Sequence, residues 1–319
     1  MAKTKREANG IKISGKIIVV IAVLVLLLLA AGVYIAPKFG GTFSEYRAAR
    51  SEYKAAKKEL SAAQAANNDI SRILGDKQKA KDESDKLSRK VFSAAAALEK
   101  DIQAGKSKKK ICYITIDDGP YNRGLKYLEI FNKYDVKATF FLTTANGDKL
   151  PDQADITASS RYPEYLKYGH TIGNHTYSHD YQNGGIYSDT GAFMKAVEDQ
   201  RKFTEEAAGG YSPVIVRFPG GTSMAGDRLG DIEDALREKG YVWADWTVDS
   251  GDSWGSDRAN SALIKSNVMA ATKEQNIMVV LFHEWSQPTI DVMPEIIEGL
   301  QEKGYIFLPL FPESMMVQR

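Results

Sequence analysis

The stretch Ile111-Cys-Tyr-Ile-Thr-Ile-Asp-Asp-Gly-Pro120 starts as an apolar, β-branched run and ends on two adjacent carboxylates. The run is typical of a buried β-strand, and Gly119-Pro120 is typical of a turn. Asp117 and Asp118 repel each other at the strand end, and packing does not require them there. Two interpretations follow: an ordinary solvated turn, or a site with a cation between the carboxylates.

Six further strand-like runs follow along the chain: residues 136–143, 169–176, 213–220, 241–248, 276–284 and 305–310. Amphipathic stretches such as 124–134, 193–207, 229–240 and 293–304 lie between them. Strands that alternate with helices predict βαβ units and a parallel sheet. We therefore expect one α/β domain over residues 108–319, barrel-like or doubly wound, with about seven parallel strands.

Most of the unusual polar residues follow the carboxyl ends of these runs. After the Asp pair come His175 and His179, Arg217, Asp249 and Asp252, and His283. The carboxyl ends of parallel strands meet at one rim of an α/β domain, where such folds build their sites. We expect these side chains to gather there.

The residue types at this rim predict metal-assisted hydrolysis. In His175-Thr-Tyr-Ser-His179 the i, i+4 spacing would bring two imidazoles to one side of a helical turn. Two histidines and one carboxylate form a three-ligand site with an open position, as in hydrolytic zinc enzymes. The other carboxylate of the Asp pair is then a candidate general base, and His283 a candidate general acid.

The runs TIDDGP, GNHTYSH, RFPGG, DSGD and VVLFH, in this order, resemble the five motifs of the polysaccharide deacetylases, carbohydrate esterase family four. The resemblance covers about residues 109–312. It implies a distorted (β/α) barrel and the metal-dependent removal of acetyl groups from acetylated sugars. It also implies that Asp118, His175 and His179 bind the metal and that Asp117 is the general base. Zn²⁺ is the expected ion, with Co²⁺, Ni²⁺ and Mn²⁺ as alternatives that accept the same ligands.

The resemblance assigns roles to four further residues. Arg217 would hold Asp117, His283 would be the general acid with Asp252 as its partner, and the backbone N–H of Gly220 would help to hold the oxyanion. Two departures concern the substrate: Gly220-Gly221 and Ser253 stand where the family usually has aromatic residues. Candidates for the missing sugar-stacking faces are Trp246, which we assign to substrate binding, Trp254 and Trp285.

The N-terminal third predicts attachment to a membrane. Residues 17–36 carry no charge and are long enough, at about 30 Å of helix, to span a bilayer. The basic tail over 1–16 predicts a cytoplasmic N-terminus and an extracytoplasmic domain. A cleaved signal peptide is the alternative. The periodic, Ala- and Lys-rich segment 37–107 predicts a helical stalk that holds the catalytic domain away from the membrane or mediates self-association. A partly ordered spacer is the alternative.

Charge and cysteine content narrow the function. The formal net charge is only +1 and both signs are mixed along the chain, so nucleic acid is not an expected partner. The single cysteine, Cys112, excludes an intramolecular disulfide and is expected to be a buried hydrophobe.

The expected partner is an acetylated polysaccharide of the cell envelope, first of all peptidoglycan N-acetylglucosamine. Other wall polysaccharides come next, and acetylated xylan or chitin last. Two alternatives compete with a metal-dependent deacetylase. A serine esterase would use Ser223, since Gly221-Thr-Ser223 resembles part of a nucleophile elbow but lacks its closing glycine. A membrane-tethered glycan-binding protein would keep the fold without turnover.

Overall fold

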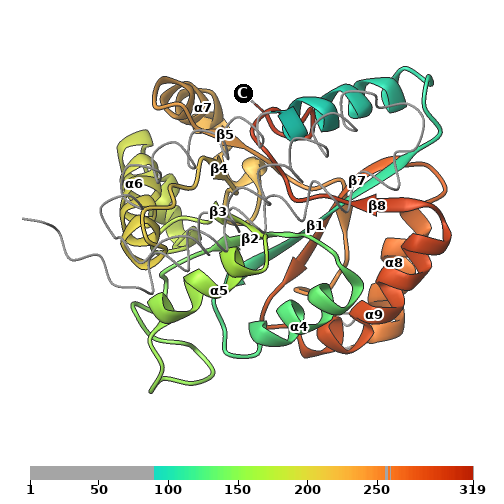
Figure 1. Ribbon diagram of the computed structural model, residues 1–319. Helices are drawn as coiled ribbons and strands as arrows, with labels where there is room; N and C mark the ends of the chain where they lie inside the picture. The colour runs from blue at the N-terminus through green and yellow to red at the C-terminus, as the bar shows by residue number, and fades with distance from the viewer. Residues whose placement is uncertain (1–89, 256–257, 259, 319) are drawn as a thin grey trace, which may run out of the picture.

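The computed structural model describes residues 90–255, 258 and 260–318 (Figure 1). Its core is one parallel sheet in the order β5-β4-β3-β2-β1-β7-β6, with β8 paired to β1. The strands are β1 (Lys110–Gly119), β2 (Thr139–Leu142), β3 (Thr171–Asn174), β4 (Ile215–Val216), β5 (Val242–Trp243), β6 (Val248–Asp249), β7 (Ile277–His283) and β8 (Tyr305–Phe307). This confirms a parallel α/β architecture.

The expectation of a single strand over residues 241–248 is corrected. That run divides into β5 and β6, which lie at opposite ends of the sheet. Val242 and Trp243 pair with β4, whereas Val248 and Asp249 pair with β7. The intervening residues 244–247 carry the chain from one end to the other, and no pairing among the described strands joins β5 to β6. The sheet is thus a half-open barrel.

Strand β1 is the central strand, and it crosses the middle of the molecule in Figure 1. Its residues 111–117 lie along β7, from Ile111 opposite Ile277 to Asp117 opposite His283. It pairs with β8 at its start and with β2 at its end. The register places Asp117 and His283 side by side at the carboxyl rim.

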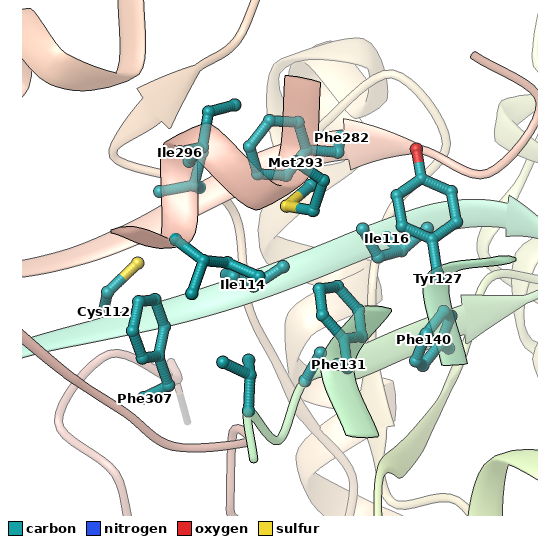
Figure 2. Packing of buried hydrophobic residues seen from close by; sticks show 14 of the residues in the cluster. Cys112, Ile114, Ile116, Tyr127, Phe131, Phe140, Phe282, Met293, Ile296 and Phe307 are labelled. Atoms are coloured by element: carbon teal, nitrogen blue, oxygen red, sulfur yellow. The ribbon is translucent and has the colours of Figure 1, made fainter. Parts of the chain in front are cut away.

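The helices are α4 (Gly124–Tyr134), α5 (Tyr162–Lys167), α6 (Thr190–Ala207), α7 (Leu229–Glu238), α8 (Ser261–Ala271) and α9 (Gln287–Glu302). Three begin at side chains that accept a backbone N–H at the N-cap: Asp189, Asn260 and Ser286. Helices α4, α5, α8 and α9 cover one face of the sheet and form the larger core with it (Figure 2). Cys112 is fully buried in this core, as expected, and burial raises the pKa of its thiol.

The other face of the sheet forms a second core. Alternate residues of β1 point into it, Ile111 and Tyr113, whereas Cys112 and Ile114 point to the helices. A helix described over residues 90–103 covers this core through Val91, Leu98 and its other buried positions. By the alternation of side chains along the strand, Asp117 shares the inner face with Tyr113.

The helix over 90–103 is joined to the sheet by a buried carboxylate. Glu99 accepts hydrogen bonds from the Tyr113 hydroxyl and the Ser314 hydroxyl, each at 2.5 Å, and from the Met315 N–H at 2.8 Å. The helix over residues 90–103 falls in the segment expected to be a stalk, so the last part of that segment packs on the domain. The boundary at residue 108 otherwise stays a prediction.

The expected membrane anchor over 17–36 and most of the stalk lie outside the described residues. Within the described residues, none of the helices combines the length and the apolar character that crossing a bilayer requires.

Candidate active site

Three side chains at the carboxyl rim form a cluster that could hold a metal ion: Asp118, His175 and His179. Asp118 Oδ1 lies 3.4 Å from His175 Nε2 and 3.1 Å from His179 Nε2. The two Nε2 atoms are 3.2 Å apart. One oxygen and two nitrogens therefore converge on one point.

The donor set fits a divalent metal. With bonds of about 2.1 Å, neighbouring ligand atoms in a tetrahedral site lie about 3.4 Å apart, close to the three observed separations. His175 Nδ1 lies 2.8 Å from the Arg217 carbonyl oxygen, which is only an acceptor, so the ring proton belongs on Nδ1. The Nε2 lone pair of His175 is then left for the metal.

The histidine pair meets through an irregular loop and not through the helical turn we expected. Strand β3 ends at Asn174, and residues 175–179 have no helical structure. Thr176 and His179 take positive φ angles of 64° and 51°. The Asn174 side chain fixes this path because its Oδ1 accepts the Thr176 N–H and its Nδ2 donates to the Val197 carbonyl. Polar contacts thus outweigh helix propensity here.

Asp118 joins the cluster because β1 is irregular at this residue. Strand alternation would turn it away from Asp117, but the pairing with β2 shifts register between Asp117 and Gly119, and Asp118 has a φ of 70°. Such backbone is costly for a residue other than glycine and is found at functional sites. Burial opposes the charge of Asp118, but its hydrogen bonds to His175 and His179 prevail and hold its pKa well below the usual range.

Asp117 is buried next to this cluster and is held by an arginine. Its Oδ2 lies 3.8 Å from His175 Nε2, and both of its carboxylate oxygens lie 3.2 Å from Arg217 Nη1. Arg217 is fully buried and donates further hydrogen bonds to Thr115 Oγ1 and to the carbonyls of Ala244 and Asp245. The guanidinium of Arg217 therefore balances the negative charge of Asp117 and fixes the orientation of its carboxylate.

His283 and Asp252 form a second pair at the rim. His283 Nδ1 lies 2.8 Å from Asp252 Oδ1, and the His283 backbone N–H donates to Asp252 Oδ2 at 2.9 Å. Burial favours the neutral imidazole, but the hydrogen bond and charge of Asp252 prevail and raise the pKa of His283 from 6.5 to about 9. The imidazole is therefore protonated at neutral pH, as a general acid requires.

We predict that Asp252→Asn lowers the pKa of His283 in the metal-free protein, because burial is then opposed only by the charges of Asp118 and Asp117. The His283–Asp252 pair of the wild type also contributes to the free energy of unfolding. This contribution is complete below pH 6.5 and is lost as the pH rises through about 9. Titration of the ring by NMR measures the pKa in both proteins. An unchanged pKa in the variant would contradict this account of His283.

The loop after Arg217 carries Gly220 with a φ of 74°. A Cβ there would lie 2.8 Å from the Met224 side chain, so a larger residue does not fit without movement. Trp246 packs its ring against the Arg217 guanidinium, with 5.5 Å between the guanidinium carbon and the ring centre. Trp246 thus adjoins the Asp117–Arg217 pair, while Gly220 follows Arg217 in the same loop, and the roles of both residues toward a substrate stay predictions.

Other candidates lie apart from this site. Ser223 is exposed, and no hydrogen bond within the described part of the chain joins it to His283, so the serine-esterase alternative gains no support.

His170 is buried beside Phe131 and Phe140 and accepts the Ala138 N–H, and burial lowers its pKa to about 3. His170 is therefore a structural residue of the core.

Sequence reasoning missed Glu284, a fully buried acid next to His283. Its oxygens accept hydrogen bonds from the Tyr165 hydroxyl at 2.7 Å and from the Tyr121 N–H at 3.3 Å. It fills the space beside Gly119, where a Cβ would lie 1.8 Å from Glu284 Oε2. Burial raises its pKa to about 8. The run VVLFHE shows the acid, but nothing in it shows that the side chain turns inward.

We predict that Glu284→Gln reduces the loss of stability that the wild type shows between about pH 5 and about pH 8. The unfolded carboxyl ionises near 4.5 while the folded one stays neutral up to about 8, so the wild type is favoured below 4.5 and penalised as the pH rises. Glutamine keeps the shape of the neutral acid and does not titrate. Thermal unfolding of both proteins across this range is the measurement, and parallel curves would refute the assignment.

The family model described as "Polysaccharide deacetylase" matches residues 104–242. This range includes the Asp118–His175–His179 cluster and Arg217 and ends before Asp252 and His283. A peptidoglycan-N-acetylglucosamine deacetylase of Bacillus cereus is 33% identical over 211 residues, which are 65% of this chain and 71% of that protein.

Two solved structures are similar in both fold and sequence. The catalytic domain of a peptidoglycan N-acetylglucosamine deacetylase from Eubacterium rectale superposes with a TM-score of 0.59 at 31% identity, covering 65% of this chain and 91% of that chain. A polysaccharide deacetylase from Bacillus cereus superposes with a TM-score of 0.56 at 28% identity, covering 65% and 94%.

Proposed function

Because the chain belongs to the polysaccharide deacetylase family, we propose that it is a metal-dependent hydrolase that removes acetyl groups from the N-acetylated sugars of an envelope polysaccharide. One observation carries the proposal. Three metal donors converge within 3.4 Å of one another at the rim where the Asp117–Arg217 and His283–Asp252 pairs also lie.

Asp118, His175 and His179 would hold the metal, with Zn²⁺ as the expected ion and Co²⁺, Ni²⁺ or Mn²⁺ as alternatives. When bound, such a cation polarises a carbonyl group and makes a water molecule easier to deprotonate.

The two remaining pairs would divide the proton transfers. Asp117 lies beside the ligand His175 and would take the proton of the attacking water as general base, with Arg217 holding its orientation. His283 is protonated at neutral pH and would give its proton to the sugar amine that leaves, with Asp252 holding the ring through Nδ1. An amide needs this second transfer because without it the sugar nitrogen would have to leave as an amide anion, which is a poor leaving group.

The substrate contacts we propose lie next to these pairs. The Gly220 N–H would help to hold the oxyanion, and the Trp246 ring, packed on Arg217, would contact the sugar. Trp254 is the most exposed aromatic side chain among the described residues, at 65% of its full area, and lies on the loop that also carries Asp252. It is the second candidate for a sugar-stacking face.

For the substrate we propose peptidoglycan N-acetylglucosamine. Two of the similar proteins bear that substrate in their names, the Bacillus cereus relative and the Eubacterium rectale structure. We also propose that residues 17–36 anchor the chain in the cytoplasmic membrane with the catalytic domain outside, which would bring it to the cell wall. Self-association through the stalk stays a prediction.

Product analysis with two substrates tests the proposal. The purified protein, supplied with Zn²⁺, would be incubated with peptidoglycan and with soluble acetylated chito-oligosaccharides, and free amines and acetate would be counted. We expect acetate from both, with faster release from peptidoglycan. Release from neither substrate would contradict the deacetylase assignment, and release from chito-oligosaccharides alone would contradict the choice of peptidoglycan.

A further inference from the structure

The two oxygens of Asp118 have different partners. Oδ1 faces the histidines, at 3.4 Å from His175 Nε2 and 3.1 Å from His179 Nε2. Oδ2 accepts a hydrogen bond from the indole N–H of Trp285 at 2.9 Å. Tryptophan Nε1 is only a donor, so this contact is unambiguous in direction.

The backbone around Trp285 is fixed on both sides. Before it, the Glu284 N–H donates to the Asp117 carbonyl at 2.9 Å, in continuation of the β1–β7 pairing. After it, Ser286 is the N-cap of α9. The Trp285 carbonyl itself accepts a hydrogen bond from Arg123 Nη1 at 3.1 Å, and Arg123 is paired with Asp152 at 3.0 Å. The indole is therefore presented to Asp118 by a rigid segment.

We propose that Trp285 is a positioning residue for the metal: its indole N–H occupies Asp118 Oδ2 and leaves Oδ1 as the single ligating oxygen. The inference rests on the proposed metal-dependent function. Asp118 sits on irregular backbone with a φ of 70°, so the strand alone does not fix the rotation of its carboxylate. A hydrogen bond to the second oxygen does fix it, and outer partners of this kind are worth about 10- to 100-fold in metal affinity.

A different role was open for Trp285 from the sequence, that of a sugar-stacking face. Its ring lies beside the His283 ring, with 5.4 Å between the centres and 39° between the planes. Phenylalanine keeps an aromatic face and lacks the N–H, so Trp285→Phe separates the two roles. If Trp285 serves only as a stacking face, the variant should bind the metal as tightly as the wild type. If its N–H positions Asp118, the variant should bind the metal more weakly.

The test is a competition titration of Zn²⁺ against a chromophoric chelator with the full-length wild type, Trp285→Phe and Trp254→Phe. The third protein is a matched control, since the Trp254 indole donates to a carboxylate too, Asp249 Oδ2 at 3.2 Å, but not to a metal donor. We expect Zn²⁺ to bind Trp285→Phe about 10-fold or more weakly, and the absorption spectrum of bound Co²⁺ to change. Trp254→Phe should bind Zn²⁺ with the affinity of the wild type.

An affinity of Trp285→Phe within about twofold of the wild type would overturn the inference and leave the proposed function standing. Equal Zn²⁺ binding by the wild type and His175→Ala would instead overturn the metal site itself. If Trp285→Phe does not fold, NMR of the Zn²⁺-loaded wild type decides. The Trp285 indole proton should exchange with water much more slowly than that of the exposed Trp254, and equally fast exchange would overturn the inference.

Discussion

Asp117→Asn is expected to abolish most of the acetate release while the protein keeps its metal. The substitution preserves shape and removes the charge that accepts a proton, and loss of a general base costs about 10²- to 10⁴-fold in rate. The metal donors Asp118, His175 and His179 remain. Arg217 keeps its hydrogen bonds to Thr115, Ala244 and Asp245, so the buried guanidinium is still paired with acceptors.

The measurements for this variant are the rate of acetate release at saturating substrate and the bound metal by elemental analysis. Asp234→Asn is the matched control, because Asp234 is an exposed carboxylate paired only with Arg237 among the contacts described. Asp234→Asn should release acetate at the rate of the wild type and bind the same amount of metal. Turnover by Asp117→Asn close to that of the wild type would remove Asp117 from the mechanism.

His175→Ala is expected to lose both metal and turnover, with Zn²⁺ affinity reduced by more than about 100-fold, the upper end of what an outer partner is worth. His175 is the most constrained donor: it is 2% exposed, and its Nδ1 is held by the Arg217 carbonyl. Alanine removes one of the three donors that converge at the rim.

His283→Ala is the informative comparison for this second variant. It removes an imidazole at the same rim, but one whose Nδ1 is engaged by Asp252 and which is not among the three converging donors. We expect it to bind Zn²⁺ as the wild type does and to lose turnover. Equal metal affinity in His175→Ala and the wild type, or metal loss in His283→Ala, would show that the ligand set is wrong.

The sequence predicted the central strand and the rim well because both depend on local patterns. The run 111–117 has the composition of a buried strand, and parallel pairing then places Asp117 opposite His283. The positions of His175, His179 and Arg217 after the ends of strands were enough to predict that they lie at the same rim.

Other features depend on contacts between distant residues, which a single sequence does not display. The run 241–248 looks like one strand, yet its halves pair with β4 and β7 at opposite ends of the sheet. The irregular backbone at Asp118 and in the 175–179 loop is stabilised by tertiary hydrogen bonds, as with Asn174 and Val197. Glu284 and Trp285 can be read in the sequence, but their hydrogen-bond partners, Tyr165 and Asp118, are distant along the chain.

The most direct test of the central claim is acetate release from acetylated chito-oligosaccharides before chelation, after removal of the metal, and after Zn²⁺ is added back. Three donors at one rim, beside a buried base and a protonated histidine, predict activity that disappears with the metal and returns with Zn²⁺. Undiminished release from protein shown by elemental analysis to be metal-free would contradict the account.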